Sequence, residues 1–558
     1  MVTNLFRNSQ RILEKQHNSI MSAASIIQFA TLLAALLGFI QTRLLISYFY
    51  DYNSGFLQGA ALDVYYVAFR IPDLVFQLLV VGALSAAFIP IFSKYQHQDK
   101  EEAFKVANSM INIILVFFLV LAALIFIFAE PLNQMLTGKN FSPEQLALSV
   151  KFTRIMLLSQ LFFAVSSFMT GIIQANHRFL IPALSPLAYN FGIIIGIIVL
   201  GPYLGIYGAA VGVLIGAFFH LALQIPLAIK LGYKYRPVIH IKHPGVTEMS
   251  TLMGPRTLAL SIDQIETLAF TRLATNLDAG SLVILTLAQK LMRAPVRIFG
   301  VPIGQASLPF LSQESAKRDL PTFRTTFLNS FHQILYVTLP ASALLVVLRI
   351  PLVRILYGAK EFPWSATLLT GKLVAILSLA IVAYATTQLT TRAFYALHNT
   401  RLPLISALIS AFVSIGTSFA LLNISNMGIV SIAIGAILGA IIQSLFLFCV
   451  LFKRLGGFDL QSLLIPILKI FIASSLTGVF LWIPMRLFDQ ILDTTRTLNL
   501  VFLTISATAI GAMVYLWLSK LLKVTQLDAY LKLFDKLGNW QKTLSSSDET
   551  LNPSNQNL

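Results

Sequence analysis

The sequence contains little charge and almost no cysteine. Only 11% of its 558 residues are charged, and Cys449 is its single cysteine. Because a soluble domain usually carries about 25% charged residues, this shortage excludes a soluble globular protein. A single cysteine also excludes a disulfide framework and a cluster of thiolate metal ligands.

The short motifs of common enzyme chemistry are missing as well. The chain has no GxxxxGK[ST] phosphate loop, no HExxH zinc motif and no GxSxG nucleophile motif. His240 and His243 have a spacing that metal ligands can use, but they lie in a basic loop and we interpret them as loop histidines. We therefore expect neither an enzyme nor an ATP-driven pump, and no metal site or cofactor.

The sequence does contain many long apolar runs. Hydrophobic residues make up 56% of the chain, the mean hydropathy is +0.78, and many apolar runs exceed the roughly 18 residues that mark a spanning helix. The sequence predicts an all-α polytopic membrane protein of about fourteen spans. They are predicted near residues 22–49, 61–93, 106–129, 152–175, 181–200, 207–230, 251–277, 282–311, 326–357, 367–393, 402–422, 428–452, 462–484 and 498–519. Prolines inside the second and eighth spans predict kinks at Pro72, Pro90, Pro295, Pro302 and Pro309.

Cations are concentrated in alternate loops. The net charge is +17, but the basic residues occupy short loops between apolar runs, so nucleic acid is not an expected partner. The less basic side has little beyond Lys139, Lys360, Arg486 and Arg496. By the positive-inside rule, both termini are predicted to be cytoplasmic.

Three short sequences recur in the same order about 220 residues apart. GIYGAAVGVLIG at 205–216 matches GIVSIAIGAILG at 428–439, and ANHRFLIP at 175–182 matches ALHNTRLP at 396–403. AAFIPIFSK at 86–94 resembles ASLPFLSQ at 306–313. The constant offset indicates an internal duplication. Two six-helix halves related in this way favour alternating access around a central site.

The duplication divides the chain into six parts. We expect a cytoplasmic N-terminus (1–21), an N-lobe (22–230), a cytoplasmic linker (231–250), a C-lobe (251–452), a final helix pair (462–519) and a C-terminal segment (520–558). In the last of these, Leu527, Tyr530, Leu531, Phe534 and Leu537 share one helical face. That pattern predicts an amphipathic helix on the cytoplasmic leaflet, followed by a disordered tail.

Charges inside spans are costly and mark candidate functional residues. The first half has Arg43, Asp63, Arg70 and Asp73. The second half has Asp263, Glu266 and Arg272 in span seven, and Lys290, Arg293 and Arg297 in span eight.

The three cations of span eight are spaced i, i+3 and i+7, which places them on one helical face. Such a stripe is suited to an anion such as a pyrophosphate or a carboxylate. The alternative is that these cations only pair with Asp263 and Glu266 on the neighbouring helix. For Asp63, near the outer end of its span, the alternatives are a cavity residue and a solvated helix cap.

Four stretches carry a family resemblance. They are LDVYYVAFRIPDL at 62–74, GALSAAFIPIFSKY at 82–95, GIIQANHRFLIPALSPLAYNFGIIIG at 171–196 and TRAFYALHNTRLP at 391–403. Together they resemble the MurJ (MviN) lipid II flippases of the multidrug/oligosaccharidyl-lipid/polysaccharide exporter superfamily. The resemblance covers roughly residues 22–520.

The resemblance implies movement of undecaprenyl-pyrophosphate-linked peptidoglycan precursor from the inner to the outer leaflet of the bacterial plasma membrane. It implies a cationic central cavity for the pyrophosphate. We predict substrate binding by Lys290, Arg293, Arg297, Asp63, Arg70, Arg43 and Arg272, and charge pairing or coupling by Asp263 and Glu266. It also implies that the final helix pair carries the polyprenyl tail. Lipid II and membrane lipids are the expected partners of a monomer, and cell-wall synthesis proteins are candidate partners.

The family's charged positions are only partly retained. Its span-two aspartate falls on Asp63, and its span-eight arginine falls on Lys290, which keeps the charge without the bidentate fork. The acidic position before it is Gln289. Three further family arginines fall on Ala35, Gln41 and Phe76. The alternatives to lipid II transport are a flippase for another polyprenyl-linked glycan, an ion-coupled small-molecule exporter and a non-transporting scaffold.

Overall fold

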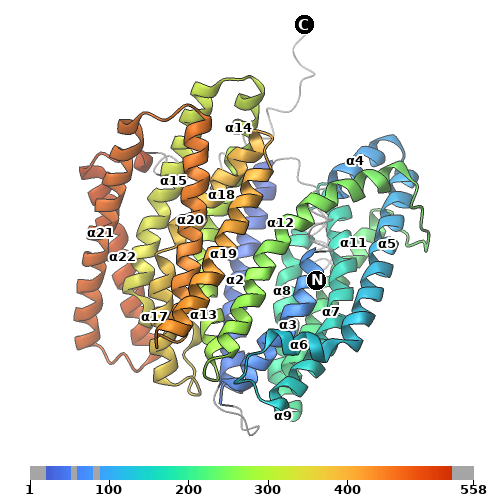
Figure 1. The fold of residues 1–558 in the computed structure, drawn as a ribbon, viewed down its shortest axis with the longest axis horizontal. Coiled ribbons are helices and arrows are strands. Elements are labelled where there is room, and N and C mark those ends of the chain that lie inside the picture. Colours follow the sequence, from blue (N-terminus) through green and yellow to red (C-terminus); the bar gives the residue numbers. More distant parts are fainter. Residues whose placement is uncertain (1–19, 52–58, 79–87, 529, 531–558) are drawn as a thin grey trace, which may run out of the picture. The chain divides into compact units, whose positions relative to one another are not determined.

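The computed structural model describes residues 20–51, 59–78, 88–528 and 530 (Figure 1). All regular elements within these ranges are helices, as the sequence predicts. Ten of them are long and apolar enough to span a membrane, or eleven if a pair bent by 42° counts as one span.

The chain forms two compact units, which we describe separately. The first comprises residues 1–285 and 356–366, and the second comprises residues 286–355 and 367–558. The first unit contains α2 (Ile20–Phe49), α3 (Ala60–Phe76), α4 (Ile89–Gln98), α5 (Lys100–Ile127), α6 (Ala129–Leu136), α7 (Pro143–Ala175), α8 (Leu180–Ile195), the π-helix η3 (Gly196–Leu200), α9 (Gly201–Leu204), α10 (Tyr207–Ala222), α11 (Ile225–Lys230) and α12 (Pro244–Thr275).

The second unit contains the π-helix η4 (Val296–Gly300), α14 (Val301–Ala316), α15 (Leu320–Val347), α18 (Ile381–Ala396), α19 (Arg401–Ile424), α20 (Val430–Arg454), α21 (Leu460–Ile491) and α22 (Thr497–Leu521). Three helices have residues in both units: α13 (Ser281–Pro295), α16 (Arg349–Tyr357) and α17 (Trp364–Ser378). The bent pair is α17 and α18.

Within the part of the chain that the structure describes, three of the expected spans contain no helix or bent helix pair that passes the length-and-hydropathy test, and α3, α4, α13 and α14 are each shorter than the 18 residues that it requires. Among the described residues, no helix within 60–98, 244–275 or 281–316 passes it. These are the predicted spans two, seven and eight, in which most of the intramembrane charges lie. In the eighth, helix α13 ends at Pro295 and continues through η4 into α14, so the expected kink takes the form of a π-helical segment.

Local signals explain where several helices begin. Ser142 and Gln145 form a capping box at the start of α7, with a proline at the first turn. Asp319 caps α15, and Asp459 caps α21 through the Ser462 amide. Hydrogen bonds from Thr322 and Ser462 hold the pKa values of Asp319 and Asp459 below their ordinary range.

Small residues allow two helix pairs to pack with their backbones in contact. In the first unit, a Cβ added to Gly192 of α8 would lie 2.3 Å from the Cα of Gly216 of α10. In the second unit, a Cβ added to Gly435 of α20 would lie 2.5 Å from the Ser414 carbonyl oxygen of α19. One residue of each pair, Gly216 or Gly435, lies in the matched segments 205–216 and 428–439.

The backbone repeats the sequence repeat at two turns. His177 and His398 are non-glycine residues with positive φ, 55° and 54°, and each follows a helix that ends with the same hydrogen-bond pattern. Gly205 and Gly428 have φ values of 58° and 56°. Left-handed backbone is unusual for histidine, so its recurrence at matched positions is what a duplicated chain would have.

The final helix pair is attached to the second unit through α15. The Tyr515 hydroxyl of α22 donates to the Tyr336 carbonyl at 2.6 Å. Beyond α22 the chain turns at Lys523, and Val524 and Leu527 are buried against Tyr336 and its neighbours. Leu527 therefore faces the helical bundle, where an amphipathic surface helix was predicted to turn it toward lipid. Leu531, Phe534 and Leu537 lie outside the described residues.

Candidate functional site

The most enclosed of the predicted charges is Asp63 on α3. It is 5% exposed, and its two carboxylate oxygens accept hydrogen bonds from the backbone amides of Gly280 (2.6 Å) and Val283 (2.8 Å). These amides belong to the first turn of α13, which has no carbonyl partners for them within its own helix. Asp63 therefore caps a helix that starts 218 residues further along the chain.

The solvated cap considered for Asp63 is wrong, because the side chain is buried. Its capping role is real, but it serves α13, and the positive end of that helix dipole stabilises the carboxylate. The acceptor cannot be replaced by water at a position that water does not reach. Within the first unit, this contact fixes the start of α13 to α3.

Two glycines make that contact possible. Gly59 and Gly280 have φ values of 80° and 84°, which side-chain-bearing residues rarely adopt. A Cβ added to Gly59 would lie only 2.6 Å from the Cα of Gly280. The Gly59 amide donates to the Tyr50 carbonyl at 2.7 Å. Neither glycine was among the residues predicted from the sequence.

Arg70 lies two helical turns beyond Asp63 on α3 and is half-buried. Its Nε donates to the Thr271 hydroxyl of α12 at 3.0 Å, so Arg70 ties α3 to α12. Asp73, one turn further, accepts a long hydrogen bond from Gln77 at 3.5 Å. The structure thus brings Asp63 and Arg70 onto one side of α3, each with a partner from a distant segment.

Arg272 has a local task in this structure. One guanidinium nitrogen donates to the carbonyls of Gln134, Met135 and Thr137, where α6 ends. Those carbonyls are among the last in α6 and lack partners within the helix. Arg272 therefore closes the C-terminus of α6, a short helix that the sequence analysis did not anticipate.

The three cations of span eight remain together at the far end of α13. Lys290 and Arg293 lie on α13, and Arg297 lies in η4. Lys290 is half-buried, whereas Arg293 and Arg297 are exposed. The positive charges of Arg297 and Lys290 repel each other, and so do those of Arg293 and Arg297. Lys290 lies about 14 Å from the start of α13 by the helical rise.

The π-helix places Arg297 where a regular helix would not. A π turn inserts one residue into the helix and rotates the following side chains, and such turns are frequent at functional sites. Pro295 ends the α-helical ladder one residue before η4. Within the described part of the chain, Arg293 and Arg297 form no salt bridge, so their charges are available to an anion.

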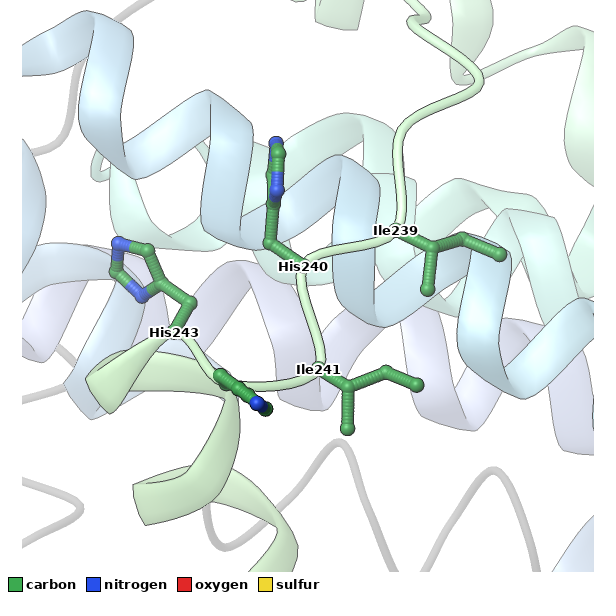
Figure 2. Close-up of a pocket in the computed structure, with 5 residues that line it drawn as sticks. Ile239, His240, Ile241 and His243 are labelled. Atoms are coloured by element: carbon green, nitrogen blue, oxygen red, sulfur yellow. The ribbon is translucent and has the colours of Figure 1, made fainter.

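The remaining predicted residues are placed separately. Arg43 is half-buried on α2. On α12, Asp263 is exposed and Glu266 is half-buried, three residues apart on one face. His240 and His243 lie on the loop before α12, and Figure 2 draws both rings. His243 accepts from the Gly245 amide as the N-cap of α12 and bonds to Glu102 at 2.8 Å.

These features define a class before any relative is considered. A polytopic helical bundle with charged side chains in its predicted spans has the features of a membrane transporter. The family described as "Lipid II flippase MurJ" matches residues 52–503. The chain belongs to the MurJ family, whose members are transporters and not enzymes.

Individual relatives agree over most of the chain. It is 27% identical over 471 residues to a probable lipid II flippase MurJ of Bdellovibrio bacteriovorus, covering 83% of this chain and 88% of that one. It is 25% identical over 480 residues to the Thermotoga maritima protein of the same description, covering 85% and 92%.

Solved structures agree as well. The chain is similar to a structure of "Lipid II flippase MurJ, inward closed conformation", with a TM-score of 0.72, 26% identity and coverage of 89% of this chain and 98% of that one. An inward-facing multidrug resistance MATE family transporter of the MOP superfamily has a TM-score of 0.62 at 16% identity, covering 76% and 94%. The second likeness is one of fold alone.

Proposed function

We propose that this protein is a lipid II flippase that moves the undecaprenyl-pyrophosphate-linked peptidoglycan precursor to the outer leaflet by alternating access. Membership of the MurJ family over residues 52–503 supports the substrate. The observation that carries the mechanism is the cluster of Lys290, Arg293 and Arg297 at the α13–η4 junction. A pyrophosphate is the part of such a lipid that needs concentrated positive charge.

The proposed architecture has fourteen spans, two lobes at 22–230 and 251–452, and a final pair at 462–519, in a bacterial inner membrane with both termini cytoplasmic. The matched backbone at His177 and His398 supports the duplication. Both lobes belong to one chain, so we propose that a monomer is sufficient.

In this proposal the cations hold the pyrophosphate during its passage. Lys290 supplies a compact charge, and Arg293 and Arg297 supply planar forks that can bind phosphate oxygens in pairs. Arg297 lies two turns from Lys290, a separation that two linked phosphates can bridge. Because Ala35, Gln41 and Phe76 stand where the family has arginines, these three cations are proposed as the main contacts for the anion.

Asp63 gives the proposed cycle a closing contact. On the less basic side of the membrane, its carboxylate holds the start of α13 through two short hydrogen bonds. Opening on that side requires these amides to part from the carboxylate and find other partners. We propose that this exchange is one of the steps that commits the protein to release.

The final helix pair is proposed to carry the polyprenyl tail. Apolar side chains remain exposed along both helices, among them Leu468, Phe471 and Val479 of α21 and Phe502 and Ile505 of α22. An isoprenoid chain requires such an apolar surface and no hydrogen bonds.

The test is complementation in a bacterium depleted of its own lipid II flippase. Growth and outer-leaflet lipid II are scored for the wild type, for Lys290→Glu and for Lys317→Glu. Lys317 ends α14 outside the cluster, so it is a matched charge-reversal control. We expect rescue by the wild type and by Lys317→Glu, and none by Lys290→Glu at equal membrane abundance.

Each other outcome has a definite meaning. If a correctly inserted wild type does not rescue, the substrate is not lipid II, and transport of other polyprenyl-linked glycans is the next assay. If Lys290→Glu rescues fully, the cluster does not hold the pyrophosphate. Failure of both variants would show sensitivity to any charge reversal and would leave the cluster without a specific role.

A further inference from the structure

The linker between α11 and α12, residues 231–243, is fixed along α5 within the first unit (Figure 1). Asn108 of α5 donates to the Lys234 carbonyl at 3.0 Å. Asn112, one turn further, donates to the carbonyls of Arg236 and Val238, both at 2.9 Å. Both asparagines are buried. The linker is therefore a strap that is bonded to α5 through its backbone.

The two ends of the strap are also secured. At its start, Tyr233 is buried and its ring meets that of Phe104 edge-on, with centroids 6.0 Å apart. Burial raises the pKa of the Tyr233 hydroxyl above its ordinary value. At its end, His243 bonds to Glu102 and caps α12. Because both ends are tied down, the segment between them has a defined face.

That outward face is apolar. Tyr235, Ile239 and Ile241 are 59%, 47% and 69% exposed. Figure 2 shows the Ile239 and Ile241 side chains pointing one way and the His240 ring another. Three large exposed apolar residues on one short segment are costly in water.

The strap reaches the level at which α5 becomes lipid-facing. Its turn at residues 236–238 is held by Asn112. Val116, one helical turn or about 6 Å beyond Asn112, begins the exposed apolar surface of α5, being 51% exposed itself, and Phe117 is 57% exposed. The apolar side chains of the strap thus continue the lipid-facing surface of α5 toward water.

Cations flank these apolar residues. Lys234 and Lys242 are exposed, and in the described part of the chain neither forms a salt bridge, whereas Arg236 pairs with Glu101 at 3.1 Å. Apolar side chains at the boundary of a bilayer with lysines beside them match the chemistry of anionic headgroups above acyl chains. A protein partner would need a matching acidic and apolar surface and would compete with lipid for this position.

We propose that residues 234–242 form a binding site for anionic phospholipid in the leaflet on the side of the basic loops. Tyr235, Ile239 and Ile241 enter the acyl boundary, and Lys234 and Lys242 hold the phosphates. The site is separate from the cationic cluster of α13, so it can fail while lipid II transport stands.

The first experiment measures depth in the full-length protein with Cys449→Ser as background. Single cysteines at Ile239, His240 and Ile241 carry a nitroxide, and the protein is placed in nanodiscs of phosphatidylcholine with phosphatidylglycerol. We expect labels at Ile239 and Ile241 to be accessible to oxygen and protected from a water-soluble nickel chelate. The label at His240 should be accessible to the nickel chelate and less accessible to oxygen. Equal nickel access at all three positions would overturn the proposal.

The second experiment measures lipid preference. A bimane at Ile241→Cys is quenched by brominated phosphatidylglycerol or by brominated phosphatidylcholine, and the ratio gives the preference for the anionic lipid. Each lysine near an anionic surface contributes about a fivefold preference, from about 1 kcal/mol per cation. We expect Lys234→Gln with Lys242→Gln to abolish the preference and Lys317→Gln to leave it.

The outcomes are separable. An apolar depth profile with no lipid preference would overturn the anionic site. Protection that is present in native membranes but absent in nanodiscs of the purified protein would mean that a protein partner covers the strap, which also overturns it.

Discussion

The two ends of α13 differ in almost every physical respect. At its start, the amides of Gly280 and Val283 are buried and bonded to one carboxylate, Asp63. At its other end, Lys290 is half-buried and Arg293 is exposed, and the helix passes into η4 with Arg297. At the first end, backbone amides are bonded to a protein carboxylate. At the second end, Arg293 and Arg297 form no salt bridge with any residue that the structure describes.

The difference separates positioning from binding. A buried charge with two short hydrogen bonds holds a segment in place, and removing it leaves orphaned donors. Exposed cations such as Arg293 and Arg297 contribute little to folding and can respond to a ligand. We therefore expect substitutions at the first end to reduce stability and transport together, and those at the second end to reduce transport alone.

The largest effect is expected for Asp63→Ala. The Gly280 and Val283 amides would lose their acceptor where water cannot replace it, at about 1–3 kcal/mol for each orphaned group. Thermal unfolding in detergent should shift clearly downward, and complementation should fail. Asp63→Asn keeps one acceptor oxygen, so its unfolding temperature should lie between those of the wild type and Asp63→Ala. A transport defect with an unchanged unfolding temperature would show that Asp63 acts on substrate and not by positioning α13.

Gly59→Ala should have a smaller but related effect. The new methyl would lie 2.6 Å from the Gly280 Cα, and the left-handed backbone costs about 1–2 kcal/mol for a side-chain-bearing residue. We expect a lower unfolding temperature and partial complementation. Gly416→Ala is the matched control, because a Cβ there meets nothing within 4 Å and alanine favours a helix. Equal effects of both substitutions would contradict the close contact between Gly59 and Gly280.

Much of the fold could be predicted because lipid imposes a simple rule on sequence. A spanning helix needs apolar length, and helices α5, α7, α10, α19 and α20 lie where that length indicates. The break at Leu379–Ala380, which bends α17 and α18 by 42°, was missed. It has neither proline nor glycine, and the Ser342 hydroxyl bonds the Ser378 carbonyl there.

The candidate site was harder to predict, because its partners are distant in sequence and belong to the backbone. Asp63 stood out as an intramembrane charge, but the pairing with Gly280 uses an amide, which every residue carries. Arg272 was predicted to contact substrate because it, too, is a charge inside a predicted span. Its carbonyl partners at the end of α6 leave no signature in residue type.

At the second end of α13, Arg297→Gln should reduce transport with little change in stability. Removing one charge-assisted contact to phosphate costs about 1.5–3 kcal/mol of binding, or roughly a tenfold to hundredfold weaker interaction. Exposed positions usually change stability by no more than about 0.5 kcal/mol. Outer-leaflet lipid II and thermal unfolding are measured on the same preparation, with Arg297→Lys as the charge-retaining control. Equal loss with Lys and Gln would mean that the fork is needed, not the charge alone.

The smallest effect on transport is expected for Arg272→Ala, which tests whether an intramembrane cation can be purely structural. Arg272 donates to three carbonyls at the end of α6, so its loss should lower stability modestly, by about 1 kcal/mol for an exposed helix end. Because these bonds are local to α6 and α12, complementation should persist. Loss of transport without loss of stability would mean that Arg272 contacts substrate. It would then not differ in role from the cations at the end of α13.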